Sequence, residues 1–165
     1  MKKRIFSLLV DNTSGVLSRV AGLFSRRGYN IESLTVGETA DPRYSRMTVV
    51  AEGDNDVLEQ ITKQLRKLVD VVDIKVLEPE SSVNRELVLV KVRVEEAERQ
   101  TVITMADVFR GKVVDVGKDS LIIELTGKQD KLDAFIRLLG GYEILELART
   151  GITGLSRGSD DVRYL

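Results

Sequence analysis

The chain has 165 residues, of which 42% are hydrophobic and 31% charged, a composition typical of a globular protein with one or two domains. The net charge of −1 gives no basic excess for nucleic acid, and charged residues recur too often for a membrane span. Histidine and cysteine are both absent. Their absence excludes disulfides, imidazole bases, thiol nucleophiles and ordinary zinc sites, which disfavours an enzyme. A cytoplasmic location is the default expectation.

The first half of the chain predicts the order βαββαβ. Its strands alternate apolar and polar residues, and its helices carry apolar residues at helical spacing. Asp54 is expected to cap the second helix and Gly28 to end the first. The expected elements are strands at 4–10, 30–39, 45–52 and 71–77, with helices at 16–27 and 55–69.

The same order recurs in the second half, although the sequence itself does not repeat. The expected elements there are strands at 86–94, 112–116, 121–126 and 143–148, with helices at 102–109 and 132–139. The fold class is therefore α+β, with two tandem ferredoxin-like βαββαβ domains. The predicted boundaries are a first domain at 1–78, a linker at 79–84, a second domain at 85–158 and a disordered tail at 159–165.

Domains of this size have thin cores, so association with another chain is expected to help them.

The turn cluster at 11–15 is the first candidate binding site. It joins a strand to a helix, where free N–H groups and the helix dipole suit an anion such as an amino-acid carboxylate. Gly15 lets a ligand approach the backbone, and the Asn12 amide can accept from an ammonium or donate to a carboxylate. From the pattern alone, an ordinary helix cap is the more common explanation.

Two other functions of this fold fit the residues poorly. RNA-binding modules need aromatic residues on the first and third strands, where this chain offers Phe6 and otherwise aliphatic residues. Acylphosphatases need an arginine in the first loop, and 11–15 contains none.

Longer stretches carry a specific resemblance over essentially the whole chain. LVDNTSGVLSRV at 9–20 and GLFSRRGYNIESLTV at 22–36 closely resemble the small regulatory subunit of acetohydroxyacid synthase, also called acetolactate synthase. Further matching segments are SRMT at 45–48, QITKQLRKL at 60–68, NREL at 84–87, FRG at 109–111 and GLSRG at 154–158.

The resemblance implies a non-catalytic regulatory subunit whose N-terminal domain is an ACT domain. In the family, ACT domains pair side by side as a homodimer and bind valine at their interface. The catalytic large subunit carries thiamine diphosphate, FAD and magnesium. The small subunit activates it and confers valine feedback inhibition in branched-chain amino acid biosynthesis. A free-standing ACT-domain sensor for another partner is the alternative, as is a different effector, isoleucine or leucine.

The resemblance also implies individual site residues. Those matching the effector site are Asn12, Gly15, Val16, Asn30 and Ile31. Those matching positions linked to feedback sensitivity are Ser18, Gly37 and Gln60. Gly37 stands where many relatives are expected to have alanine, so a larger side-chain pocket is expected and strict valine preference does not follow.

Overall fold

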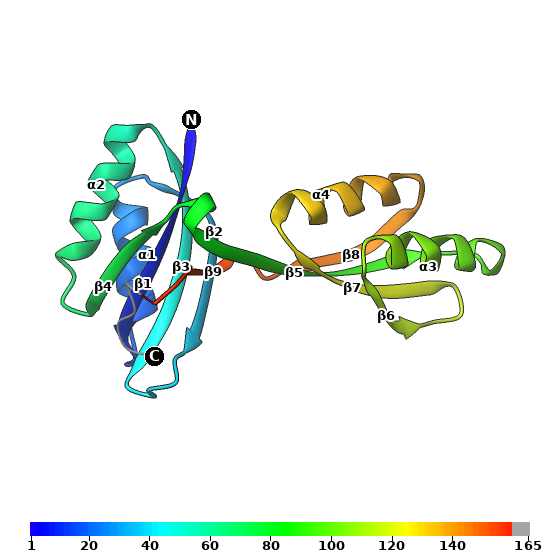
Figure 1. Ribbon diagram of the computed structural model, residues 1–165, viewed down its shortest axis with the longest axis horizontal. Coiled ribbons are helices and arrows are strands. Elements are labelled where there is room, and N and C mark those ends of the chain that lie inside the picture. The colour runs from blue at the N-terminus through cyan, green and yellow to red at the C-terminus, as the bar shows by residue number, and fades with distance from the viewer. Residues whose placement is uncertain (160–165) are drawn as a thin grey trace. The chain divides into compact units, whose positions relative to one another are not determined.

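The computed structural model describes residues 1–159, which form two compact units (Figure 1). The first unit contains Met1–Asn84 together with residues 152–159, and the second contains Arg85–Gly151. The chain therefore passes between the units twice, after Asn84 and after Gly151.

The first unit confirms the predicted βαββαβ order, and its four strands form one antiparallel sheet in the order β2-β3-β1-β4. Its elements are β1 (Lys2–Asp11), α1 (Val16–Arg26), β2 (Asn30–Glu38), β3 (Tyr44–Gly53), α2 (Asn55–Arg66) and β4 (Val71–Leu77). The local signals behave as predicted. The Asp54 carboxylate accepts a 2.8 Å hydrogen bond from the Val57 N–H at the start of α2, and Gly28 has a φ of +68° just after α1.

Both helices of the first unit cover the same face of its sheet (Figure 1). Alternate residues of β1 point into the layer between sheet and helices, where Phe6, Leu8 and Val10 are buried. Each fully buried apolar side chain of this kind contributes roughly 1.5–3 kcal/mol to stability.

The opposite face of the same sheet is also partly covered. Leu9, Val50 and Leu77 are buried there, although none belongs to the core beneath the helices. A short strand, β9 (Thr153–Ser156), lies against β3 and β4. The Thr35 hydroxyl donates to the Ile152 carbonyl at 3.3 Å, which ties the start of this return segment to β2. The sequence predicted no strand here.

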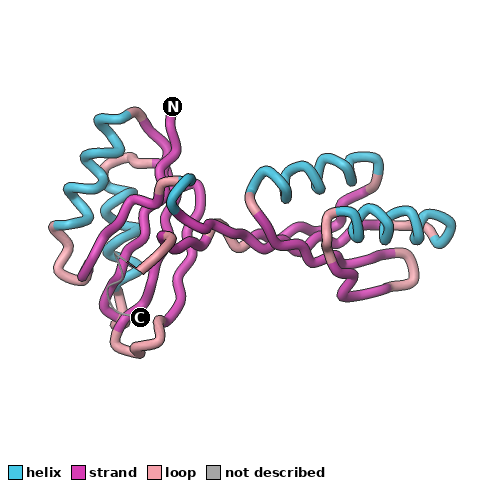
Figure 2. Tube along the Cα trace, in the orientation of Figure 1, coloured by secondary structure: helices cyan, strands magenta, loops and turns pink. Residues whose placement is uncertain are grey.

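The second unit repeats the arrangement of two helices on one sheet (Figure 2). Its strands follow the order β6-β7-β5-β8, and β9 also pairs with β5. Its elements are β5 (Ser82–Arg93), α3 (Arg99–Val108), β6 (Lys112–Val116), β7 (Ser120–Gly127), α4 (Gln129–Leu138) and β8 (Glu143–Arg149). Short 3-10 turns lie at Pro79–Ser81, Glu96–Glu98 and Leu139–Gly141. The predicted α+β class with tandem ferredoxin-like units is confirmed.

The second compact unit begins at Arg85, the start expected from the sequence, but two neighbouring stretches lie elsewhere in the structure than their expected labels indicate. The stretch 79–84, expected as a linker, forms a 3-10 turn and the beginning of β5. The stretch 152–158, expected in the second domain, lies with the first unit. A hydrogen bond of 2.8 Å from the Arg157 N–H to the Ser81 carbonyl holds the two stretches together. Of the expected disordered tail, 160–165 lies outside the described residues.

Candidate functional site

The corner between β1 and α1 is built on a glycine in a left-handed backbone conformation. Gly15 is the N-cap residue of α1 and has a φ of +86°, which side chains with a Cβ rarely adopt. Within the described residues, no side chain caps this helix, so the hydroxyl and carboxyl groups at 11–14 do not act as the ordinary cap. The N–H groups of the first turn, beginning with Val16, therefore remain suited to a bound anion.

Val16 contributes to this corner through its backbone alone, because its side chain is 4% exposed and belongs to the core.

Asn12 is held in place by the hairpin between β2 and β3. Its backbone N–H donates to the Arg43 carbonyl at 2.8 Å. Its Nδ2 donates to the Pro42 carbonyl at 3.0 Å and to Glu38 Oε2 at 3.1 Å. These bonds orient the amide, and its Oδ1 is then the atom that can accept a hydrogen bond from a ligand's ammonium.

An ion pair between Arg19 and Asp70 lies beside the same corner. The Arg19 guanidinium donates to both Asp70 oxygens, at 2.5 and 3.1 Å. It lies so close to Gly15 that a Cβ added there would be 2.8 Å from Arg19 Nη1. The Asp70 carbonyl accepts from the Asp11 N–H at 2.9 Å. Asp70 therefore contacts Asp11 directly, and it holds Arg19 beside Gly15.

Hydrogen bonding to Arg19 holds the pKa of the Asp70 carboxyl below its usual value, and Asp70 in turn raises the pKa of Arg19. Both groups are therefore charged at neutral pH. Sequence reasoning did not identify this pair. Arg19 lies one helical turn after Gly15, but nothing local to the sequence points to Asp70 as its partner.

Asn30 and Ile31 lie at the other end of the sheet from Asn12. Asn30 pairs with Glu52, and Glu52 pairs with Lys3, which precedes Asn12 by nine positions. At strand spacing this separates the two asparagines by roughly 30 Å within one chain. Asn30 and Ile31, which the resemblance assigns to the effector site with Asn12, therefore do not lie beside Asn12 within a single chain.

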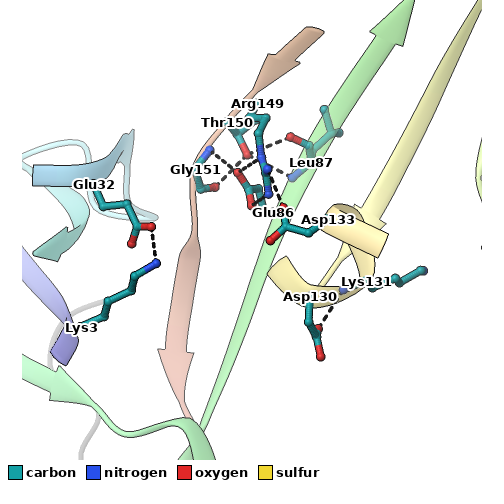
Figure 3. A network of polar contacts seen from close by, with 10 residues as sticks. All are labelled: Lys3, Glu32, Glu86, Leu87, Asp130, Lys131, Asp133, Arg149, Thr150 and Gly151. Atoms are coloured by element: carbon teal, nitrogen blue, oxygen red, sulfur yellow. Dashed lines mark hydrogen bonds and ion pairs between the residues drawn. The ribbon is translucent and has the colours of Figure 1, made fainter. Parts of the chain in front are cut away.

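The β2 strand that carries Asn30 is an edge strand of the sheet within the described residues. The Ile31 side chain packs partly on the core. A bulge follows at Glu32, whose carboxylate accepts from Lys3 Nζ at 2.5 Å. Figure 3 includes this pair at the start of β2.

The three positions linked to feedback sensitivity are all exposed but do not lie together. Ser18 is in the first turn of α1, beside the corner. Gly37 is near the end of β2, opposite Arg46, and open space surrounds the position where its Cβ would be. Gln60 lies on α2, where its Oε1 accepts from the Tyr29 hydroxyl at 3.3 Å.

The described residues contain no group of three or more acidic side chains placed to hold a metal ion. None of the helices in 1–159 has the length and apolar character that crossing a membrane requires.

Comparison with known proteins accounts for both units. Residues 6–73 match the family described as the AHAS small subunit-like ACT domain, and residues 85–158 match the small subunit of acetolactate synthase. A protein of Methanothermobacter thermautotrophicus named "Probable acetolactate synthase small subunit" is 55% identical over 156 residues, covering 94% of this chain and 93% of its own length.

Two further relatives cover almost the full length. The acetolactate synthase isozyme 3 small subunit of Salmonella typhimurium is 50% identical over 162 residues, which is 98% of this chain and 99% of the relative. The crystal structure of the acetolactate synthase small subunit from Thermotoga maritima is 43% identical and superposes with a TM-score of 0.89, covering 96% of this chain and 99% of that one. This chain therefore belongs to the family of acetolactate synthase small subunits.

Proposed function

We propose that this chain activates the catalytic subunit of acetolactate synthase and makes that enzyme sensitive to inhibition by valine. The catalytic subunit would carry the thiamine diphosphate, FAD and magnesium, and this chain would supply the effector site. Membership of the small-subunit family supports the partner. The observation that carries the effector proposal is the uncapped, glycine-based corner at Gly15 with an oriented Asn12 amide beside it.

The proposed site suits the two charges of a free amino acid. The first-turn N–H groups of α1 and the positive end of its dipole would hold the carboxylate. Asn12 Oδ1 would accept from the ammonium. Burial of an isopropyl side chain would add roughly 1.5–3 kcal/mol, and the open space beside Gly37 is the proposed place for it.

Two copies of the chain are needed to complete this site. Asn12 and Asn30 lie at opposite ends of the sheet, yet the resemblance assigns both to one effector. The exposed edge of β2 offers unpaired backbone groups within the described residues, which favours pairing with another strand. A two-fold axis beside β2 would set two β2 strands antiparallel and bring the Asn12 end of one copy to the Asn30 end of the other.

Effector binding would then depend on how the two copies meet. A ligand shared between subunits binds one dimer geometry more tightly than another, and this difference shifts the population of the dimer. If the catalytic subunit also binds one dimer geometry more tightly than the other, valine would change its activity through the same shift in population.

The test is titration of valine into the purified chain by calorimetry, with Asn12→Ala as the variant and Asn55→Ala as a matched control. Asn55 is an exposed asparagine at the start of α2, away from the proposed corner. Loss of a hydrogen bond to a charged group costs about 1.5–3 kcal/mol, so we expect Asn12→Ala to weaken binding roughly 10- to 150-fold. Asn55→Ala should bind like the unmodified chain.

Assays with the catalytic subunit complete the test. Asn12→Ala should still activate that subunit while losing most of the valine inhibition. Gly15→Asp should be more severe, because its carboxylate would occupy the position proposed for the ligand's carboxylate. Unchanged valine affinity in both variants would contradict the site. A chain that stays monomeric with valine, measured by sedimentation, would contradict the shared interface.

A further inference from the structure

The end of α2 carries a group of exposed cations around an exposed valine (Figure 1 labels the helix). We name this group the α2 patch; its members are Arg27, Lys63, Arg66, Lys67 and Val69. All four cations are exposed, and Val69 is 94% exposed. The three cations at the end of α2 lie within about one helical turn. The Arg27 side chain reaches the same helix from the end of α1, since its Nη2 donates to Gln64 Oε1 at 3.1 Å.

The cations of the α2 patch form no ion pair within residues 1–159, because the carboxylates near them are engaged elsewhere. Glu59 accepts from Arg4 Nη1 at 3.0 Å, and Asp70 holds Arg19. Asp56 lies in the first turn of α2, at the opposite end of the helix. The whole chain has 25 basic and 26 acidic residues, so the patch is a local excess of positive charge and not part of a general one.

Val69 is held in a defined turn between two anchored neighbours. The Leu68 N–H donates to the Leu65 carbonyl at 3.2 Å, the Val71 N–H donates to the Leu68 carbonyl at 3.1 Å, and the Leu68 side chain packs on the core. Asp70 is fixed by hydrogen bonds of its carboxylate and its carbonyl. The valine is therefore presented to solvent at a set position, and a partner that covers it need not order this turn on binding.

Helix chemistry accounts for only part of the α2 patch. The negative end of a helix dipole favours cations in the last turn, which explains why basic residues occur there. It does not explain Arg27, which comes from another helix, or an apolar residue exposed among the cations. An apolar centre within a charged rim is instead the composition of a surface that binds another protein.

We propose that the α2 patch docks an acidic surface of the catalytic subunit, with Val69 at the apolar centre of the contact. The inference rests on the proposed function and deepens it, because it names the surface that receives that partner. Unpaired cations attract a negatively charged surface during encounter and orient it. A nucleic acid fits less well, since four cations at one place do not make a basic stripe and the net charge of the chain is −1.

The position of the α2 patch beside the effector corner supports this assignment. Asp70 directly follows Val69, and its carbonyl accepts from the Asp11 N–H at 2.9 Å. Its carboxylate holds Arg19 beside Gly15. The patch and the corner thus belong to the same unit and are joined by one residue, which offers a short path for an effector signal.

The test measures the dissociation constant between the whole chain and the catalytic subunit at about 0.1 M and about 1 M salt, where the screening length is about 10 Å and about 3 Å. The variant combines Lys63→Gln, Arg66→Gln and Lys67→Gln, because glutamine removes the charge and keeps a similar helix propensity. We expect its dissociation constant to rise at least about tenfold at the lower salt concentration and less than about threefold at the higher one.

The matched control combines Lys112→Gln, Lys118→Gln and Lys128→Gln. These three lysines are exposed in the second unit, and their replacement changes the net charge of the chain by the same amount. The control should bind the catalytic subunit within about twofold of the original chain at both salt concentrations, because its charges lie outside the docking surface.

Val69→Ser tests the apolar centre separately. The side chain is almost fully exposed, so we expect an unchanged melting temperature. The dissociation constant should rise about fivefold or more at both salt concentrations, because loss of an apolar contact is not screened by salt. Valine titrated into each free variant should bind within about twofold of its affinity for the original chain, which shows that the first unit is folded.

Four outcomes overturn the inference. Either α2-patch variant binding as tightly as the original chain would do so while leaving the proposed function standing. Equal weakening by the matched control would assign the attraction to overall charge. Duplex DNA that binds the original chain and not the glutamine variant, with binding to the catalytic subunit unchanged, would assign the patch to nucleic acid. Absence of any complex between the original chain and the catalytic subunit would remove the proposed function, and the inference with it.

Discussion

Replacement of Gly15 by alanine tests the left-handed corner directly, and Gly37 provides the comparison. Gly15 has a φ of +86°, where a residue with a Cβ costs about 1–2 kcal/mol. The new Cβ would also be 2.8 Å from Arg19 Nη1, so the end of the Arg19 side chain has to shift. Gly37→Ala adds the same methyl group to a strand with open space around it, where alanine is favoured over glycine by about 0.5–1 kcal/mol.

The two variants are therefore expected to differ by about 1.5–3 kcal/mol in the unfolding free energy of the first unit. Hydrogen exchange measured peptide by peptide is the suitable assay, because it reports α1 and the sheet of the first unit separately from the second unit. We expect faster exchange in α1 for Gly15→Ala and equal or slower exchange for Gly37→Ala. Equal protection in both variants would refute the conformational reasoning about Gly15.

Three further predictions concern stability. Phe135→Ala should lower the unfolding free energy of the second unit by about 3–5 kcal/mol in denaturant titrations, because this side chain is 0% exposed and its ring centre lies 5.3 Å from that of Phe109; a loss below 1 kcal/mol would contradict the assigned core. Asp70→Asn should destabilise the chain more at pH 6 than at pH 2. Arg19 lowers the Asp70 pKa in the folded state, so the contribution of Asp70 to stability is complete above about pH 4 and is lost as the pH falls through the folded pKa. Melting curves that differ equally at both pH values would disprove this. Thr48→Val should leave the melting temperature unchanged or raise it, with a gain of up to about 1 kcal/mol, because the buried Thr48 hydroxyl has no hydrogen-bond partner among the described residues; a clear loss would show that the hydroxyl is satisfied.

Much of the fold could be predicted because its signals are local. Alternation along 4–10 and helical spacing from Val16 onward depend on neighbours a few positions away, and the structure has β1 and α1 there. Asp54 and Gly28 mark helix ends through chemistry that acts within one turn. The topology then follows, because βαββαβ orders favour few arrangements.

The return of the chain to the first unit could not be predicted in this way. Thr153–Ser156 contains a single large apolar residue, Leu155, and it is 61% exposed, so no alternation marks the strand. The strand lies against β3 and β4, and the residue before it, Ile152, accepts a hydrogen bond from Thr35; all of these partners are distant in sequence. Long-range pairing of this kind leaves no periodic trace.

The ion pairs of this chain also could not be predicted, because their partners are distant in sequence. Arg19 and Asp70 are 51 positions apart, and Arg149 and Glu86 are 63 apart. A single sequence contains many acidic and basic residues, so it does not indicate which of them meet. The candidate corner at Asn12 and Gly15 was found because it is contiguous, whereas the residues that brace it were not.

The division of the first unit between two distant stretches has a consequence for synthesis on the ribosome. The sheet and both of its helices emerge early, but the Ile152 carbonyl that bonds to Thr35 and the strand β9 emerge only after the whole second unit. Domains that fold during translation do so as their residues become available. A nascent chain ending before Ile152 would therefore present one face of its finished sheet to solvent, and to chaperones, until translation passed the second unit.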